Sequence, residues 1–313
     1  MSNEIDRIAI IGTGTIGASW AAYYLARGLD VVATDPAPGA EASLRRFVDQ
    51  AWPALVAQGL SPGASQDRLR FDANLTKAVS EAQLIQENAP ERPDFKIKLF
   101  AEIDAASAPE AIIASSSSSI TVSVMQSGCK RPERVVLGHP FNPPHLIPLV
   151  EVVGGEKTSP EYVDRAIAFY RGIGKKPIRL RKEMPGHVAN RLQAALYREV
   201  LYLVEQKVLD VGDADDAVSW GPGLRWGVMG PSLLFHLGGG AGGMQHFIEH
   251  LLPPMQNLWK VLGTPAVTPE LTRAVVDGVT SETGGKSVEQ LESDRDEMLI
   301  QLLGVRRNAE AKR

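Results

Sequence analysis

The sequence predicts an α/β fold, in which a doubly wound, mostly parallel sheet is followed by an all-helical domain. Three observations support this prediction: an apolar run at 8–11 that leads into a glycine-rich motif, an alternation of apolar and helical stretches behind it, and purely helical periodicity after Pro185-Gly186. We therefore expect a sheet domain over residues 1–184 and a smaller helical domain over residues 185–313.

Apolar runs of the strand type recur along the first domain. Runs such as 111–114 are apolar at every position, which is typical of strands buried on both faces of a parallel sheet. Helical stretches at 39–58 and 94–106 separate the early runs, so we expect helices on both faces. The expected strands lie at 7–11, 30–34, 83–87, 111–115, 134–138, 147–153 and 176–180.

The second domain shows helical spacing instead. Thr268-Pro269 opens one helix, and Ser287 with Gln290 forms a capping-box pair at the start of another. The tract Gly238–Gly243 follows no strand, so it predicts a flexible connection between helices and not a second phosphate site. One apolar stripe is formed, at a spacing of three or four residues, by Val188, Leu192, Ala195, Leu196 and Leu203.

The glycine motif has the form of a strand, a tight turn and a helix start. Gly12 permits the turn, Gly14 lets a pyrophosphate approach the backbone, and Gly17 lets the helix pack close to the strand. The helix start supplies free N–H groups and a positive dipole end to the phosphates. Asp35 ends a second strand, where it can bind a ribose diol and repel a 2′-phosphate, so the sequence predicts NAD rather than NADP. The expected cofactor site consists of Gly12, Thr13, Gly14, Thr15, Ile16, Gly17 and Asp35.

The composition limits the classes of function. The chain has 313 residues, a formal net charge of -4 and no basic stripe, so neither nucleic acid nor an acidic membrane surface is an expected partner. No apolar run approaches the roughly 18 residues of a membrane span, and no signal peptide is visible. Cys129 is the single cysteine, which excludes a disulfide within the chain and favours the reducing cytoplasm. Nothing in the sequence suggests a metal site.

A candidate base and its partner lie on neighbouring apolar runs. An enzyme that oxidises an alcohol with NAD needs a base near the hydroxyl and a group that orients this base. His139 follows the run 135–137 and should reach the carboxyl edge of the sheet, where ligands of open α/β sheets bind. Glu151 lies inside the run 149–153, where a carboxylate needs a partner, and His139 is the obvious one. The alternatives are a loop histidine bonded to a carbonyl and an edge-strand glutamate that faces solvent.

Two further polar features accompany this pair. The serine run 115–119 also follows a buried strand, so a hydroxyl there can hold a substrate oxygen; the alternative is a polar turn without a ligand. Asn190 lies in the first turn of the first helix of the second domain, where its amide can bond the substrate across the domain cleft. The alternative is a capping or solvent-facing asparagine.

Taken together, these residues make the chain resemble the 3-hydroxyacyl-CoA dehydrogenase family over nearly its full length. The resemblance implies a Rossmann domain for NAD, His139 as the general base and Glu151 as the carboxylate that orients it. It also implies that Ser118 and Asn190 contact the substrate oxygen. The matching pieces are Gly12-x-Gly14-x-x-Gly17, Glu91 with Lys96, Ser116–Ser119, His139-x-x-Asn142-Pro143, Leu149–Val152 and Pro185-Gly186-x-x-x-Asn190-Arg191.

The resemblance has two further implications. Glu91 and Lys96, which otherwise look like ordinary surface charges, are expected near the nicotinamide ribose. The chain is also expected to form a homodimer through its helical domain.

Within the family, the details resemble a subgroup that oxidises L-carnitine instead of a CoA thioester. The expected reaction is the NAD-dependent oxidation of the 3-hydroxyl of a small hydroxy acid, L-carnitine to 3-dehydrocarnitine. The alternatives are a gulonate 3-dehydrogenase of the lambda-crystallin type, a 3-hydroxybutyryl-CoA dehydrogenase and a non-catalytic, crystallin-like structural protein. The chain departs from the subgroup at the serine run, which replaces Ser-Ser-Thr-Ser, and at Pro144-His145. The segments that carry the resemblance are 35–40, 52–55, 86–92, 223–226, 269–272 and 291–296.

Some aromatic residues of the helical domain suit such a substrate. L-Carnitine carries a quaternary ammonium group, and proteins bind such cations with aromatic faces. Trp220, Trp226 and Phe235 can form an aromatic wall, and Arg225 can pair with the substrate carboxylate. The alternative is that these aromatic side chains pack helices against one another.

Overall fold

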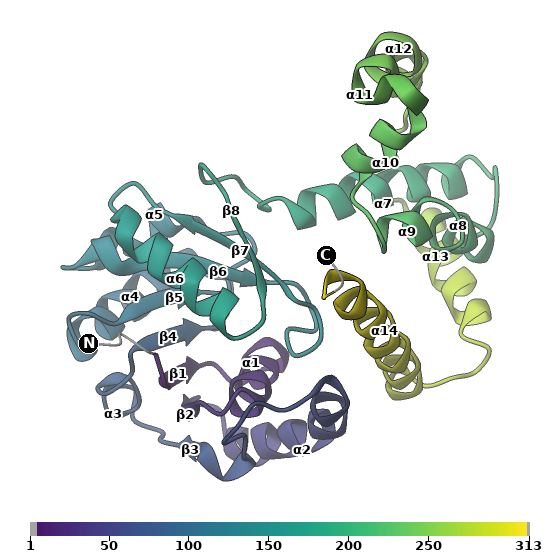
Figure 1. The fold of residues 1–313 in the computed structure, drawn as a ribbon. Helices are drawn as coiled ribbons and strands as arrows, with labels where there is room; N and C mark the ends of the chain where they lie inside the picture. The colour runs from purple at the N-terminus through teal and green to yellow at the C-terminus, as the bar shows by residue number, and fades with distance from the viewer. Residues whose placement is uncertain (1–4, 312–313) are drawn as a thin grey trace. The chain divides into compact units, whose positions relative to one another are not determined.

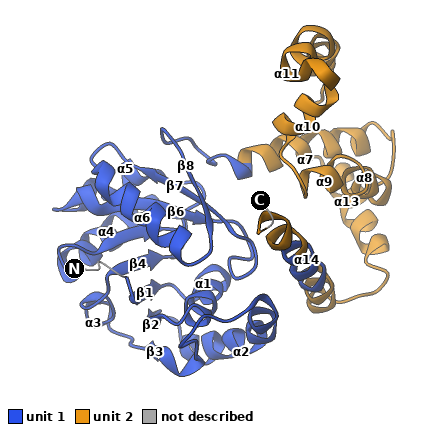
Figure 2. Ribbon diagram, in the orientation of Figure 1, with its two compact units in different colours: residues 1–190, 296–304 blue, residues 191–295, 305–313 orange. Residues whose placement is uncertain are grey.

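The computed structural model describes residues 5–311, which fall into two compact units (Figure 1; Figure 2). Unit 1 holds the chain up to residue 190 together with 296–304, and unit 2 holds 191–295 together with the chain from residue 305. The domain boundary after residue 184 stays a prediction. The structure keeps the next residues with unit 1, where Val188 and Ala189 donate backbone hydrogen bonds to Glu151.

Unit 1 contains an eight-stranded sheet in the order β3-β2-β1-β4-β5-β6-β7-β8, which confirms the expected α/β fold. Neighbouring strands are parallel except for β6 and β7, which are antiparallel. The strands are β1 (Arg7–Ile11), β2 (Asp30–Thr34), β3 (Leu69–Phe71), β4 (Leu84–Glu87), β5 (Ile112–Ser115), β6 (Val135–Pro140), β7 (Leu149–Gly154) and β8 (Lys176–Arg179). All seven expected strands are present, and β3 is an addition.

Two apolar clusters lie on opposite sides of the sheet. Side chains alternate along β1, so that Ile8 and Ile10 join the cluster with α1, α2 and α6, whereas Ala9 and Ile11 join the cluster with α4 and α5. β1 is therefore buried on both faces, as its uninterrupted apolar sequence predicts. The helices of unit 1 are α1 (Thr15–Ala26), α2 (Ala40–Gln58), α3 (Leu75–Val79), α4 (Pro93–Ala106), α5 (Val122–Met125) and α6 (Pro160–Gly172).

Beyond β8, the chain as far as residue 311 contains helices and no strand. Both predicted helix starts are confirmed: Thr268 accepts a hydrogen bond from the Leu271 backbone, and Ser287 with Gln290 forms the capping box. The tract Gly238–Gly243 joins two helices, as expected. The main helices are α7 (Ala189–Glu205), α8 (Val211–Ser219), α9 (Pro222–Trp226), α10 (Pro231–Gly238), α11 (Gly243–His246), α12 (Leu252–Trp259), α13 (Pro269–Glu282) and α14 (Val288–Glu310).

Most of the predicted apolar stripe lies on α7. Leu192 is 68% exposed and Leu196 is 37% exposed, so residues 5–311 leave part of this stripe uncovered. The small core of unit 2 consists of Val204, Val211 and Leu271. Within residues 5–311, the helices are too short or too polar to cross a lipid bilayer.

Candidate functional site

The turn between β1 and α1 is shaped by its glycines. Gly12 has a φ of 82°, a value that L side chains rarely adopt. A Cβ atom on Gly17 would lie 1.9 Å from the Gly12 carbonyl oxygen, so only glycine lets α1 approach the strand this closely. The space beside Gly14 is open, because a Cβ atom there would meet nothing within 4 Å. No side chain caps α1, and no acidic residue lies in its first turn, which leaves its N–H groups available to an anion.

Asp35 follows β2 and is bound to the glycine turn. Its Oδ2 accepts hydrogen bonds from the Thr13 backbone N–H at 2.7 Å and from the Thr13 hydroxyl at 3.2 Å, and its Oδ1 accepts one from the Ala37 backbone at 2.9 Å. A carboxylate has about four acceptor positions, so room for a ribose hydroxyl remains. The open space at Gly14, the uncapped helix and this carboxylate all fit a dinucleotide.

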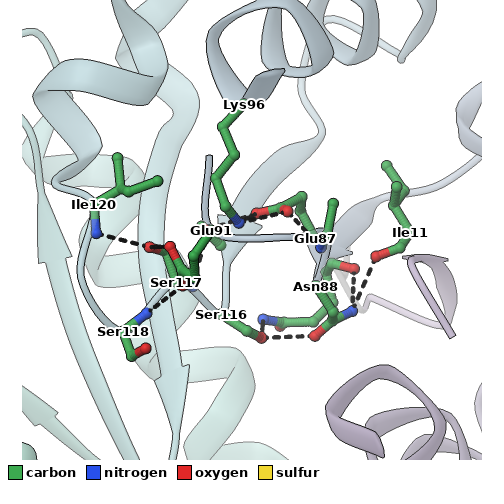
Figure 3. Close-up of polar contacts among 12 residues, drawn as sticks. Ile11, Glu87, Asn88, Glu91, Lys96, Ser116, Ser117, Ser118 and Ile120 are labelled. Carbon is green, nitrogen blue, oxygen red and sulfur yellow. Dashed lines mark hydrogen bonds and ion pairs between the residues drawn. The ribbon is translucent and has the colours of Figure 1, made fainter. Parts of the chain in front are cut away.

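The loop after β5 carries the serine run and is held by Glu91 (Figure 3). The Glu91 carboxylate accepts hydrogen bonds from the Ser117 hydroxyl at 2.8 Å, the Ser118 backbone N–H at 2.8 Å and the Ser119 hydroxyl at 3.2 Å. Ser117 Oγ also accepts a bond from the Ile120 backbone. Glu91 therefore fixes the shape of the serine loop, and does not project freely toward a ribose.

The hydroxyl groups of the first two serines also donate hydrogen bonds within the protein. The Ser115 hydroxyl donates to Glu87 Oε2 at 2.6 Å, and the Ser116 hydroxyl donates to Asn88 Oδ1 at 2.7 Å. Ser118 is half-buried, and among residues 5–311 no bond of its hydroxyl group is found. The structure thus leaves Ser118 as the serine that can offer its hydroxyl to a ligand.

Lys96 lies in the interior, paired with a residue that the sequence did not single out. Its ammonium group contacts Glu87 Oε1 at 2.7 Å and Oε2 at 2.9 Å, and both side chains are almost fully buried (Figure 3). The interpretation of Lys96 as an exposed charge is therefore wrong. The expected position of Lys96 near the nicotinamide ribose stays a prediction.

His139 and Glu151 lie directly opposite each other in the antiparallel pair β6–β7. His139 Nδ1 is 2.9 Å from Glu151 Oε2, and both residues are buried. The other carboxylate oxygen, Oε1, accepts hydrogen bonds from the backbone of Val188 at 2.8 Å and of Ala189 at 3.1 Å. The alternatives of a loop histidine and a solvent-facing glutamate are both excluded by this geometry.

The electrostatics of the pair determine which ring nitrogen of His139 carries the proton. Burial alone would raise the pKa of Glu151, but the hydrogen bonds from His139, Ala189 and Val188 outweigh it and the pKa is lowered. An ionised carboxylate only accepts hydrogen bonds, so the proton of a neutral His139 lies on Nδ1. Nε2 is left with a free lone pair and can act as a base.

The segment at the start of α7 adds two side chains. Asn190 is half-buried in the first turn of α7, two residues beyond Val188. His187 is buried, and its ring centroid lies 4.9 Å from that of His139. Sequence reasoning missed His187, although a histidine in a turn that follows Pro185-Gly186 was a visible signal.

A polar network behind His139 was also missed. The Gln86 amide donates to the Ser116 hydroxyl at 2.8 Å and to the Gly138 carbonyl at 3.1 Å, while its oxygen accepts from Tyr24 at 3.1 Å and Tyr170 at 2.7 Å. Gln86 therefore connects the serine loop to the strand that carries His139. A glutamine directly after the apolar residues Leu84 and Ile85 of β4 could have indicated it.

The candidate substrate residues of unit 2 differ in their surroundings. Trp220 is 75% exposed, whereas Phe235 stacks on Phe247 with ring centroids 4.5 Å apart. Arg225 and Trp226 lie next to each other on α9 and are exposed. Phe235 thus follows the packing alternative, while the other three remain accessible to a ligand.

Comparisons with known proteins identify the family of the chain. The family model for the 3-hydroxyacyl-CoA dehydrogenase NAD binding domain matches residues 7–184, and the model for the C-terminal domain matches residues 186–282. The chain is 48% identical to the L-carnitine dehydrogenase of Bacillus cereus over 96% of this chain and 92% of that protein. It is 48% identical to the L-carnitine dehydrogenase of Pseudomonas aeruginosa over 99% and 96% of the two chains.

Solved structures show the same fold. The NAD+ dependent dismutase 5-formyl-3-hydroxy-2-methylpyridine 4-carboxylic acid 5-dehydrogenase is 36% identical with a TM-score of 0.82, over 98% of this chain and 99% of that one. The 3-hydroxybutyryl-CoA dehydrogenase of Escherichia coli is 29% identical with a TM-score of 0.63, over 75% of this chain and 49% of that one. The glycine turn, the buried histidine–glutamate pair and matches over both domains lead to one conclusion: the chain belongs to the 3-hydroxyacyl-CoA dehydrogenase family and is an NAD-dependent dehydrogenase that acts on a CH–OH group.

Proposed function

We propose that the chain oxidises the 3-hydroxyl of L-carnitine with NAD. The observation that carries a hydroxy-acid oxidation is the buried His139–Glu151 pair, with Nδ1 and Oε2 2.9 Å apart. The choice of L-carnitine rests on 48% identity to L-carnitine dehydrogenases over nearly the full length of the chain. The same identity and the intact pair weigh against a non-catalytic, crystallin-like role.

Each site residue has a role in this proposal. His139 Nε2 takes the proton of the substrate hydroxyl, and Glu151 stabilises the imidazolium that forms. Ser118 and Asn190 hold the substrate oxygen. Bound NAD would supply the acceptor for the hydride that leaves the alcohol carbon.

The cofactor site is proposed at the glycine turn. In this proposal, Asp35 binds the adenosine ribose, and six residues surround the pyrophosphate. These six residues are Gly12, Thr13, Gly14, Thr15, Ile16 and Gly17. Glu91 contributes by fixing the serine loop, and Lys96 by neutralising the buried Glu87 beneath it.

Substitution of Asp35 by alanine is expected to weaken NAD binding and to relax the rejection of NADP. The carboxylate is lost as a partner of the ribose diol, and so is its repulsion of a 2′-phosphate. Isothermal titration with each cofactor measures both effects. Because Asp35 also binds Thr13, circular dichroism should confirm that the variant folds. An unchanged ratio of the two affinities would contradict the role of Asp35.

A substrate panel tests the reaction itself. L-Carnitine, D-carnitine, L-gulonate, 3-hydroxybutyrate and 3-hydroxybutyryl-CoA are each supplied with NAD, and NADH absorbance is followed. L-Carnitine is expected to give the highest kcat/KM. The 36% identity to the pyridine-carboxylate dehydrogenase favours one second candidate, an aromatic hydroxy or formyl acid, which joins the panel. Turnover of that acid alone would overturn the carnitine assignment.

Recognition of the carnitine cation is proposed at unit 2. Trp220 and Trp226 offer exposed aromatic faces for the quaternary ammonium, and Arg225 offers a charge for the carboxylate. Phe235 is left to a supporting role, because it stacks on Phe247. Replacement of Trp226 by leucine should raise KM for L-carnitine, and an unchanged KM would remove this residue from the site.

A homodimer formed through the helical domain is the proposed assembly. Most of the exposed large apolar side chains of the described residues belong to unit 2, among them Leu192, Trp259 and Val276, and such surfaces mark protein interfaces. Light scattering should show a mass of two chains of 33.8 kDa, and a single-chain mass at micromolar concentration would exclude this dimer. Residence in the cytoplasm stays a prediction.

A further inference from the structure

His187 occupies an unusual backbone position beside the proposed base. Its φ is 49°, in the left-handed region that few residues other than glycine adopt, and it follows Gly186 with a φ of 74°. Backbone strain of this kind persists where the surroundings impose it, and it gathers at functional sites. The strained backbone of the turn 186–189 therefore indicates a functional role for this turn.

The side chain of His187 is 3% exposed and has one hydrogen bond. Nε2 lies 2.9 Å from the Ser117 carbonyl oxygen, which can only accept, so Nε2 carries the proton. Nδ1 is buried and has no partner among the described residues. Packing alone does not account for a histidine here, because an apolar ring would fill the same space without an unpaired nitrogen.

The same turn contacts both parts of the candidate site. His187 holds the carbonyl of Ser117, directly before Ser118, while the backbone of Val188 and Ala189 donates to the carboxylate of Glu151. The serine loop and the histidine–glutamate pair are thus joined through three neighbouring residues.

The charge state of His187 suits this task. Burial lowers the pKa of His187; it outweighs the bond to the Ser117 carbonyl and the nearby carboxylates of Glu151 and Glu91, which act in the opposite direction, while His139 lowers this pKa further. His187 is therefore neutral near pH 7. A neutral neighbour lets His139 take up a proton without repulsion between two cations.

We propose that His187 is a positioning residue for alcohol oxidation, and that its bond to the Ser117 carbonyl holds Ser118 at a working distance from His139. The proposal rests on the function proposed above for His139 and Ser118. His187 acts through these residues and is not assigned a contact with the substrate.

The matched variants His187→Gln and His187→Met test the bond. Both side chains are flexible and similar in length, and both face the same backbone strain. The glutamine amide nitrogen reaches about as far as histidine Nε2 and can donate to Ser117, whereas methionine has no donor. We expect glutamine to keep kcat within about threefold of the wild type and methionine to lower it roughly tenfold, the equivalent of one lost hydrogen bond.

Two further readouts separate positioning from stability. With substrate deuterated at the carbinol carbon, the isotope effect on kcat should be larger for methionine than for the wild type, while the Kd of NAD is unchanged. Equal loss of kcat in both variants, or a change confined to thermal stability, would overturn the proposal.

A further measurement examines the His187 hydrogen bond without depending on turnover. In the 15N-labelled wild-type protein, the His187 signal, assigned by its absence in His187→Gln, should show the neutral Nε2–H tautomer near pH 7. An Nδ1–H tautomer or an imidazolium would overturn the proposed bond. If no substrate of the panel is turned over but this tautomer is found, the proposed function fails and the bond stands.

Discussion

Replacement of His139 by alanine should lower kcat by roughly 10²–10⁴-fold, the usual range for loss of a general acid or base, and leave NAD affinity unchanged. His139 is buried at the end of β6, with Nδ1 bound by Glu151 and Nε2 free to receive a proton. The glycine turn that is proposed to bind NAD begins at Gly12, directly after a different strand, β1. Steady-state kinetics beside isothermal titration with NAD separates catalysis from cofactor binding.

A matched control excludes a general effect of losing a histidine. His250 is an exposed histidine of unit 2, and His250→Ala is expected to keep wild-type turnover. If His139→Ala turned over substrate as fast as this control, His139 could not be the base. A lowered affinity for NAD together with lowered kcat would instead indicate that the variant disturbs the fold of unit 1.

Substitution of Glu151 by glutamine is expected to lower kcat by a similar factor, roughly 10²–10⁴-fold, although the side chain keeps its size. The two carboxylate oxygens face three donors, on His139, Val188 and Ala189. A glutamine has one accepting oxygen and one donating amide group, so it cannot serve donors on both sides.

Either orientation of the glutamine is unfavourable. If its amide faces His139, Nδ1 must accept and the proton moves to Nε2, which removes the base. If its amide faces the turn, the N–H groups of Val188 and Ala189 lose their acceptor. Glu161→Gln, an exposed residue in the first turn of α6, is the matched control. A kcat for Glu151→Gln within threefold of this control would contradict the role of Glu151.

The sheet domain could largely be predicted because its signals are local. Uninterrupted apolar runs and a glycine turn specify buried parallel strands within a few residues, and all seven expected strands are present. β3 escaped prediction because its three residues have no periodic pattern of their own and depend on pairing with β2. The stripe on α7 was correct as a pattern, but its exposure depends on what covers it.

The candidate site could be predicted only in part. The types and spacing of Gly12, Asp35, His139 and Glu151 predicted a nucleotide-binding turn and a base with its orienting carboxylate. The sequence did not show that Lys96 pairs with Glu87, or that Glu91 binds the serine loop. Both interactions lie near the end of a strand, and the tertiary fold decides which side chain reaches that place.

Local sequence was enough to establish a dinucleotide-binding α/β protein, since a turn, a helix start and an apolar strand each depend on neighbours along the chain. Only the tertiary structure decided which of these residues contact one another. The antiparallel register of β6 and β7 sets His139 opposite Glu151, and the strained turn brings His187 to Ser117. Contacts of this kind arise from long-range packing, where a shift of one residue in a strand would turn each side chain to the other face.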